Sequence, residues 1–226
     1  MTDQTKHNVP SPPAADPGRR YLPGMGRDWL LPLYDPIARA LGAPSAHRLL
    51  ADQADLRPGQ RVLEIGCGTG NLLLLVKRQH PDATVLGLDP DPKALARAAR
   101  KAGRAALSVE LDRGFADQLP YPDGSVDRVL SAFMFHHLEP AQRQSALREV
   151  RRVLAPGGSL HLLDFGGATD RPDGLLARLA HHSHRLQDNY GDRILTLMWD
   201  AGLANPRETA HRVTRIGRYT CYRADR

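Results

Sequence analysis

The sequence predicts an α/β fold in which a parallel sheet is covered by helices on both faces. Between residues 61 and 165, short apolar runs alternate with helical patterns, as is typical of parallel strands joined by crossover helices. A glycine-rich turn joins the first of these strands to its helix. Two neighbouring β-rich runs follow at residues 207–214 and 216–223, with Gly217 near their join. They predict an antiparallel hairpin at one edge of the sheet.

The order of elements follows from hydrophobic spacing and from turn residues. Four prolines among Ser, Ala, Asp and Gly leave residues 1–20 with almost nothing apolar to bury, which predicts a disordered tail. Apolar residues then recur at helical spacing, interrupted by Pro32 and Pro36, so we expect one or two short helices there. We expect strands at residues 62–65, 84–89, 107–111, 125–133 and 159–165. We expect helices at residues 45–54, 71–79, 92–102 and 140–154, the last broken by Pro156-Gly157-Gly158, and then at 174–189 and 191–202.

The composition is that of an ordinary globular protein and excludes several classes. The chain's 226 residues, 41% of them hydrophobic, suffice for one domain without a disulfide or metal staple. The longest aliphatic run, residues 72–76, is far shorter than the ~20 residues of a membrane span, and we expect no secretory signal. The only cysteines are Cys67 and Cys221, which excludes a disulfide scaffold and a cysteine-based zinc site and favours a reducing, cytoplasmic location.

The net charge of +6 is concentrated toward the C-terminal end of the chain. The last 56 residues carry 10 Lys or Arg residues against 6 acids. Nucleic-acid interfaces combine a dense basic stripe with aromatic side chains, whereas aromatic residues make up only 5% of this chain. A solvated, arginine-rich surface explains the excess, and we expect no nucleic-acid partner.

The strongest motif is the glycine loop, residues 66–70 (Gly-Cys-Gly-Thr-Gly). It follows a buried strand and opens a helix, so backbone N–H groups and the positive end of the helix dipole face the crevice where open α/β sheets bind ligands. Its G-x-G-x-G spacing is one residue shorter than the dinucleotide fingerprint, and no Gly-Lys-Ser/Thr follows. Glu64, just before the first glycine, would repel a pyrophosphate but would suit a cationic ligand without phosphate.

An acidic residue ends the second expected strand. Asp89 lies 19 residues after Gly70, at a strand tip where a carboxylate can accept two hydrogen bonds from ribose hydroxyls. The alternative role is to cap the next helix, but Asp91 is better placed for that, immediately before Pro92. Asp89 therefore indicates a ligand that contains a ribose.

Five motifs follow one another along the chain at suitable spacing. They are Leu63-Glu64-Ile65-Gly66-Cys67-Gly68-Thr69-Gly70, Gly87-Leu88-Asp89, residues 119–127, Phe135-His136-His137-Leu138 and Leu154-Ala155-Pro156-Gly157-Gly158. In this order they resemble the motifs of class I S-adenosylmethionine-dependent methyltransferases, in particular the type 11 group. The resemblance covers about residues 56–165 and extends loosely to the C-terminal hairpin.

The resemblance implies a Rossmann-like, doubly wound sheet of seven strands in the order 3-2-1-4-5-7-6, with strand 7 antiparallel, in a three-layer α/β/α arrangement. Residues 21–226 would form one domain, with a helical lid at 21–56, a cofactor-binding core at 57–165, and acceptor-side helices with the hairpin at 166–226. The cofactor would be S-adenosyl-L-methionine, with the loop glycines around its methionine part, Asp89 on the ribose and Pro90 beside the adenine. The cofactor-binding residues that we predict are Glu64, Gly66, Cys67, Gly68, Gly70, Asp89, Pro90, Phe115, Ala116, Asp117 and Ser131.

The chain departs from the family pattern after the third strand. Family members read Gly-Asp-Ala-Glu ahead of Leu-Pro, and the Asp of that loop meets the adenine amino group. Residues 114–117 of this chain read Gly-Phe-Ala-Asp instead. Either Asp117 reaches the adenine, or Phe115 packs on its ring while backbone near Ala116 supplies the polar contact.

Three residues are candidates for acid–base chemistry at the acceptor site. His136 and His137 follow the fourth strand, where the acceptor site should open, and a histidine can act as a base near neutral pH. Asp164, at the end of the fifth strand, is expected to face the same cleft. The alternative for the histidine pair is a structural loop element. Methyl transfer needs a base only if the acceptor must lose a proton to react.

Other aromatic and histidine residues carry weaker signals. Tyr21 and Tyr34 belong to the expected lid and either close it or pack as buried helix aromatics. His181, His182 and His184 form a cluster, and the first and last share a helix face. A metal site would need further ligands, so a polar helix face is the preferred interpretation and we expect no metal.

The function that we expect is S-adenosylmethionine-dependent methylation of a small-molecule acceptor by in-line displacement. Signatures of amino-group and cytosine C5 methylation of nucleic acids are absent from the sequence. One alternative is a lipid-like acceptor, such as a prenylated quinone precursor or a phospholipid, which the short stretch at residues 33–36 favours weakly. Another is a cofactor-binding regulatory protein without turnover. The motifs fix neither the acceptor, nor the methylated atom, nor the oligomeric state.

Overall fold

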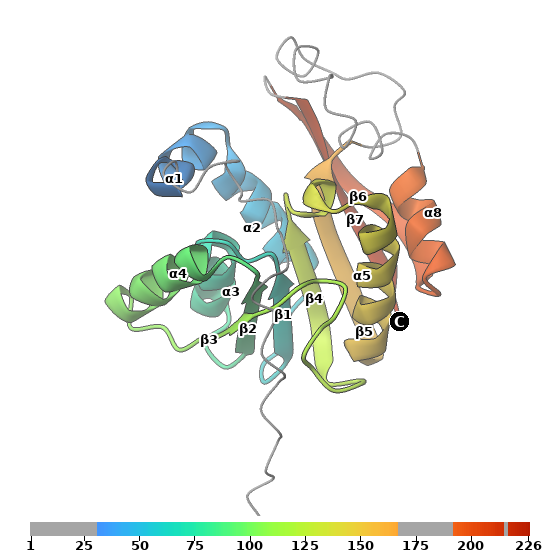
Figure 1. The fold of residues 1–226 in the computed structure, drawn as a ribbon, viewed down its shortest axis with the longest axis horizontal. Helices are drawn as coiled ribbons and strands as arrows, with labels where there is room; N and C mark the ends of the chain where they lie inside the picture. Colours follow the sequence, from blue (N-terminus) through green and yellow to red (C-terminus); the bar gives the residue numbers. More distant parts are fainter. Residues whose placement is uncertain (1–30, 167–191, 215–216) are drawn as a thin grey trace, which may run out of the picture.

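Seven strands form one sheet in the order β3-β2-β1-β4-β5-β7-β6 (Figure 1), as the resemblance implies. The structure is a computed structural model, and it describes residues 31–166, 192–214 and 217–226. Strands β1 to β5 pair in parallel, whereas β7 pairs antiparallel with both β5 and β6. The strands are β1 (Arg61–Ile65), β2 (Thr84–Asp89), β3 (Glu110–Arg113), β4 (Val126–Ala132), β5 (Leu154–Phe165), β6 (Ala204–Thr214) and β7 (Gly217–Asp225).

Helices cover both faces of this sheet, which confirms the three-layer arrangement. Figure 1 shows α3 and α4 near the β1–β3 half of the sheet and α5 and α8 near β5–β7. The expected tail at residues 1–20, Tyr21 and the expected helix at 174–189 lie outside the described residues. The helices are α1 (Leu31–Ala40), α2 (Ala43–Gln53), α3 (Asn71–Gln79), α4 (Pro92–Arg104), α5 (Pro140–Val153) and α8 (Arg193–Asp200), with a short 3-10 turn, η2 (Phe135–His137).

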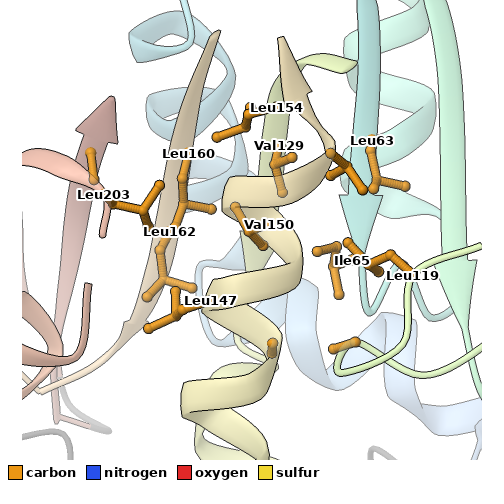
Figure 2. Packing of buried hydrophobic residues seen from close by; sticks show 14 of the residues in the cluster. Leu63, Ile65, Leu119, Val129, Leu147, Val150, Leu154, Leu160, Leu162 and Leu203 are labelled. Atoms are coloured by element: carbon orange, nitrogen blue, oxygen red, sulfur yellow. The ribbon is translucent and has the colours of Figure 1, made fainter. Parts of the chain in front are cut away.

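The side chains of the central strand β1 point alternately to the two faces of the sheet and pack in a hydrophobic cluster on each face. Successive side chains of a strand point to opposite faces, and parallel strands carry helices on each. Leu63 and Ile65 point to the face covered by α5 and α8, where they belong to one hydrophobic cluster. Figure 2 shows Leu147 and Val150 of α5 in that cluster. All residues of this central strand after Arg61 are thereby removed from water.

A second hydrophobic cluster fills the opposite face, beneath α2 and α3. Val62 of β1 points into it, together with Leu50 of α2 and Leu73 and Val76 of α3. All four side chains are at most 1% exposed. Helix α2 is therefore part of the core, and α1 packs against it.

The hairpin β6–β7 closes one side of the sheet, as the sequence predicts. Strand β7 lies between β5 and β6, and β6 forms the outer edge. The β6–β7 ladder shifts register between Ala204 and Arg207 and again between Glu208 and Ala210. These irregularities and the positive φ of Asn205, +51°, twist the outermost strand.

The third strand was predicted three residues too early, at 107–111 instead of Glu110–Arg113. Helix α4 continues to Arg104, and the N–H of Leu107 donates to the carbonyl of Ala102 at 3.0 Å. Ala106 has a φ of +52°, typical of the residue that ends a helix. Leu107 therefore belongs to the helix end, and its apolar side chain was the wrong signal for a strand.

Two prolines were also misinterpreted. Helix α5 ends at Val153 and β5 begins at Leu154, so Pro156-Gly157-Gly158 lies inside β5 and does not break the helix. The β4–β5 register shifts there, since Val126 pairs with Leu154 and Arg128 with Ser159. The triplet forms a bulge. Helix α1 likewise runs through Pro36, which removes one N–H donor but does not end this ten-residue helix.

Candidate functional site

The glycine loop turns β1 into α3 through three glycines in the left-handed region. The φ angle is +72° at Gly66, +52° at Gly68 and +79° at Gly70. Glycine adopts such angles without the clash that a Cβ would cause. Gly70 is also the N-cap residue of α3, so the free N–H groups of the first helical turn lie beside the loop.

Replacing Gly66 with Ala is expected to lower the free energy of unfolding by roughly 2–4 kcal/mol, which would lower the Tm by several degrees. An added Cβ would lie 2.3 Å from Cγ and 2.8 Å from Cβ of Met134, in addition to the strained φ. Thermal denaturation of the free protein measures the loss. The matched control is Gly59→Ala, because Gly59 has a φ of +78° with no atom within 4 Å of the added Cβ. An equal loss in both variants would contradict the contact with Met134.

Asp89 clamps the glycine loop from the tip of β2. Its Oδ2 accepts a hydrogen bond from the N–H of Gly68 at 2.8 Å, and its Oδ1 accepts one from the N–H of Asp91 at 2.8 Å. Asp91 is the N-cap of α4 and accepts from the N–H of Lys93 at 2.8 Å, as the sequence predicts. Burial raises the pKa of Asp89 to about 6, against the effect of these N–H donors. The carboxylate thus holds the loop and keeps lone pairs for a ligand.

Glu64 provides a buried acid directly behind the loop. Its side chain lies on β1, and Oε2 finds no hydrogen-bond partner among the described residues. Burial, and then repulsion from Asp89, raise the pKa of Glu64 well above its usual value. Two neighbouring buried acids are costly unless a positive group approaches them. The site therefore fits a ligand that is cationic near the loop and carries a ribose, as S-adenosylmethionine does.

Two of the predicted cofactor-binding residues, Cys67 within the loop and Ser131 on β4, have buried side chains. The Cys67 thiol is buried, and burial raises its pKa well above the usual value, so the thiol is not a reactive one. Ser131 on β4 is buried, and its Oγ donates to the carbonyl of Ile65 at 3.1 Å. Their predicted contacts with the cofactor stay predictions.

The loop predicted to hold the adenine lies beside Asp89. The N–H of Gly114 donates to the Asp89 carbonyl at 3.3 Å, which places residues 114–118 next to the tip of β2. A tight turn follows, in which Gln118 N–H donates to the carbonyl of Phe115 at 3.1 Å. Ala116 is buried, whereas Phe115 and Asp117 are half-buried. Pro90 is half-buried at the same edge of the sheet. Both alternatives for the adenine contact remain compatible with this placement.

Two of the three candidate catalytic residues form a hydrogen-bonded dyad. Nδ1 of His136 lies 2.6 Å from Oδ1 of Asp164, and the backbone N–H of His136 donates to Oδ2 at 2.9 Å. Asp164 also accepts from the N–H of Phe165 at 2.7 Å. An ionised carboxylate accepts only, so Nδ1 carries the proton and Nε2 is left as the basic nitrogen.

The environment keeps Asp164 ionised although it is buried. Burial alone would raise the pKa of this carboxyl, but the charge and hydrogen bond of His136 and two backbone N–H groups hold it below its usual value. Asp164 has 0% of its side chain exposed, against 16% for His136. Of the two members of the dyad, His136 is therefore the one that is partly exposed, and the expectation that Asp164 faces a cleft stays a prediction.

His137 and an aromatic cluster surround the dyad. The rings of His136 and His137 lie 4.2 Å apart, and Phe165 meets His136 edge-on at 5.5 Å. Phe133 contacts Phe165 at 5.0 Å and Tyr219 at 5.9 Å. Phe133 has a φ of +53°, a rare angle for a bulky residue at the end of a strand. Sequence reasoning missed Phe133, Phe165 and Tyr219, which share no motif: Phe133 directly follows β4, Phe165 ends β5 and Tyr219 lies on β7.

A second set of residues at the glycine loop was also missed. Asp35 of α1 and Lys101 of α4 meet at the loop and at the start of α3. The signal was present, because the chain has 31 Lys and Arg residues of which only four are lysine, and Lys101 is one of them. A lysine retained in such an arginine-rich chain indicates a position where a compact ammonium group is needed.

The remaining sequence expectations concern metals, membranes and the lid. His181, His182, His184 and Tyr21 lie outside the described residues, and the side chain of Tyr34 does as well. Across residues 31–166, 192–214 and 217–226, no three His, Cys, Asp or Glu side chains are placed to bind a metal ion. No helix in these ranges has both the length and the apolar character to cross a membrane.

Comparisons with known proteins agree with this site. A family model described as a methyltransferase domain matches residues 62–158. The demethylmenaquinone methyltransferase of Thermus thermophilus is 38% identical over 153 residues, which cover 66% of this chain and 69% of that protein. A solved S-adenosylmethionine-dependent methyltransferase from Aquifex aeolicus has a TM-score of 0.64 at 23% identity, over 87% of this chain and 96% of that one.

The fold by itself does not determine the reaction. The crystal structure of the cyclase SpnF matches with a TM-score of 0.73 at 19% identity, over 96% of this chain and 99% of that chain. The assignment is carried by the 38% identity to the Thermus protein over 153 residues. The chain therefore belongs to the class I S-adenosylmethionine-dependent methyltransferases and uses S-adenosyl-L-methionine as its cofactor.

Proposed function

We propose that this enzyme methylates a small-molecule acceptor from which the His136–Asp164 dyad removes a proton. The observation that carries the proposal is the 2.6 Å hydrogen bond between Nδ1 of His136 and Oδ1 of the fully buried Asp164. A buried, ionised carboxylate fixes the tautomer and the orientation of the imidazole, which is how many enzymes prepare a general base. The basic Nε2 is then available to an acceptor hydroxyl.

The cofactor supplies an electrophilic methyl group when it is bound. Glu64 and Asp89 would hold its positive and ribose parts, and the backbone of residues 66–70 would follow its methionine part. The dyad lies past the end of β4, and β4 neighbours β1 in the sheet, so base and glycine loop share the carboxyl edge. The protein's contribution is to align the acceptor atom, to take up its proton at Nε2 of His136 and to exclude water.

An aromatic acceptor with a hydroxyl group suits the surroundings of the dyad. Phe133, which follows β4, and Phe165 and Tyr219, on β5 and β7, contribute aromatic side chains. Loss of the hydroxyl proton makes both the oxygen and the ring carbons of such a compound more nucleophilic. The 38% identity to a demethylmenaquinone methyltransferase favours a prenylated quinol as the specific acceptor. A phospholipid lacks the acidic hydroxyl that would explain the dyad, which makes it the weaker alternative.

The most informative experiment incubates the purified protein and methyl-labelled cofactor with cell extract divided into metabolite, lipid and RNA pools. We expect label in the metabolite or lipid pool, and only with protein present. Label in RNA, or in none of the pools, would contradict the proposal. We also propose a cytoplasmic location, because both cysteines are buried free thiols, as is typical of proteins in a reducing compartment.

A direct assay separates the quinol from other acceptors. Demethylmenaquinol and its oxidised quinone differ in the hydroxyl protons that the dyad would remove. We expect the reduced compound to be methylated and the oxidised compound to be inert. Equal turnover of both would rule out the proposed role of the dyad, and turnover of neither would rule out the quinol as acceptor.

A further inference from the structure

A polar network connects helix α1 to the glycine loop. Oδ1 of Asp35 accepts hydrogen bonds from Oγ1 of Thr69 at 2.6 Å and from Nδ2 of Asn71 at 2.8 Å. Oδ2 of Asp35 lies 2.6 Å from Nζ of Lys101, on α4. One carboxylate of α1 therefore contacts the loop, the first residue of α3 and α4 at once.

Lys101 closes the same network from the other side. Its Nζ donates to the carbonyl of Thr69 at 2.9 Å, to Oγ1 of Thr69 at 3.1 Å and to Oδ1 of Asn71 at 2.8 Å. Thr69 and Asn71 thus each bond to both charged residues. We call Asp35, Thr69, Asn71 and Lys101 the α1 latch.

The α1 latch differs from an ordinary surface ion pair. The side chains of Lys101 and Asp35 are 30% and 22% exposed, and Thr69 is buried. Burial opposes ionisation of Asp35, but the hydrogen bonds of Lys101, Thr69 and Asn71 hold its pKa below the usual value. Exposed pairs contribute little because water screens them and both side chains are free to move. Here each charge has several partners in a fixed geometry.

The latch and Asp89 hold adjacent residues of the loop from opposite sides. Asp89 fixes the N–H of Gly68, and the latch fixes the side chain and carbonyl of the next residue, Thr69. Glycine at 68 has no side chain to restrict the peptide between these two points. The position of that peptide therefore depends on where α1 places Asp35.

We propose that Asp35 and Lys101 are positioning residues that set the glycine loop for the cofactor and so couple the docking of α1 to cofactor binding. The coupling is reciprocal by linkage: a bound cofactor stabilises the docked helix, and an undocked helix weakens cofactor binding. Neither side chain needs to touch the cofactor. The inference rests on the assignment of the glycine loop to the cofactor.

The test measures the affinity for S-adenosylmethionine by calorimetry in Lys101→Met and Asp35→Asn, alongside the melting temperature of each free protein. We expect Kd to rise about tenfold in either variant, within the roughly 5–150-fold range typical of coupled sites. The matched control is Lys77→Met. Lys77 also bonds backbone carbonyls, those of Pro81 and Ala83 at 2.7 Å, but at the far end of α3.

The control separates positioning from stability alone. A purely structural role predicts that Lys101→Met and Lys77→Met lower the melting temperature alike and that neither changes Kd for the folded protein. That result would overturn the proposal. An Asp35→Asn/Lys101→Met double variant should bind about as weakly as either single variant, because each change breaks the same network. Fully additive losses would overturn the proposal as well.

Hydrogen exchange reports the coupling directly. In the wild-type protein, saturating cofactor should slow amide exchange in α1, and in Lys101→Met this protection should be lost while the loop is still protected. Unchanged protection of α1 in the variant would overturn the proposal. If instead the glycine loop does not bind the cofactor, a different result is expected: Asp89→Ala would then leave the Kd for S-adenosylmethionine unchanged.

Discussion

Asp89→Ala should weaken S-adenosylmethionine binding by roughly 10²–10⁴-fold, the largest effect that we expect from any single change. In the proposed binding mode, the substitution removes two charge-assisted hydrogen bonds to the ribose, each of which would contribute about 1.5–3 kcal/mol. It also frees the N–H of Gly68, which Asp89 holds at 2.8 Å. Calorimetric titration at pH 7.5 measures the loss. The matched control is Asp82→Ala, an exposed acid two residues before the start of the same strand, which should keep wild-type affinity.

The same carboxyl predicts how binding depends on pH. Burial raises the pKa of Asp89 to about 6, so the group is ionised above that pH and neutral below it. Affinity should be constant from pH 8 to 7 and fall by up to about tenfold per pH unit below 6. The free energy of unfolding of the unbound protein should show the opposite dependence on pH. A carboxyl with a raised pKa stabilises the fold when it is protonated, and this contribution is lost as the pH rises through 6. A wild-type pH profile retained in Asp89→Ala would assign the titration to another group, such as Glu64.

His136→Ala should lower kcat by about 10²–10⁴-fold while leaving the affinity for the cofactor within twofold. The imidazole is the proposed proton acceptor, and the interactions described for it are with Asp164, His137 and Phe165. Asp164→Asn should have a similar effect, because an amide no longer imposes the tautomer in which Nε2 is basic. Steady-state kinetics with the acceptor identified by labelling measure kcat, and calorimetry measures Kd.

His137→Ala serves as the comparison for the dyad. His137 stacks on His136 at 4.2 Å, whereas the described hydrogen bonds to Asp164 come from His136 and Phe165. We expect a loss of kcat much smaller than that of His136→Ala. Full turnover in both variants would remove the base from the mechanism and leave alignment of the acceptor as the protein's contribution. Because Asp164 is buried, the melting temperature of Asp164→Asn must be measured to separate lost activity from lost fold.

The parts of the fold that could be predicted are the elements whose bounds depend on residues close together in the sequence. Strand β2 and helix α3 have the expected bounds, since each is a short, strongly patterned segment between turn residues. Strand order followed from the resemblance alone, because no local pattern says which strands pair. The errors at Leu107 and Pro156 arose where an apolar residue or a proline has one meaning locally and another in the assembled sheet.

The site also contains some residues that the local sequence identifies and others that only the assembled fold brings together. Glycines and acids at strand ends can be recognised from the sequence, because the backbone conformation and the ligand chemistry both restrict the residue type. The hydrogen bond between His136 and Asp164 joins residues 28 positions apart, and the one between Asp35 and Thr69 joins residues 34 apart. Such contacts arise only when the sheet brings the strand ends together. His136 and Asp164 were therefore found singly, whereas Asp35 and Lys101 were not found.

The outer strand of the sheet has a consequence for solubility. An edge strand presents unpaired N–H and C=O groups that can recruit strands of other molecules, and natural proteins protect such edges with bulges and charges. Strand β6 has two register shifts and exposes Arg207, His211 and Arg212. Part of the basic excess near the end of the chain thus lies on an edge strand, where charged side chains disfavour pairing with strands of neighbouring molecules.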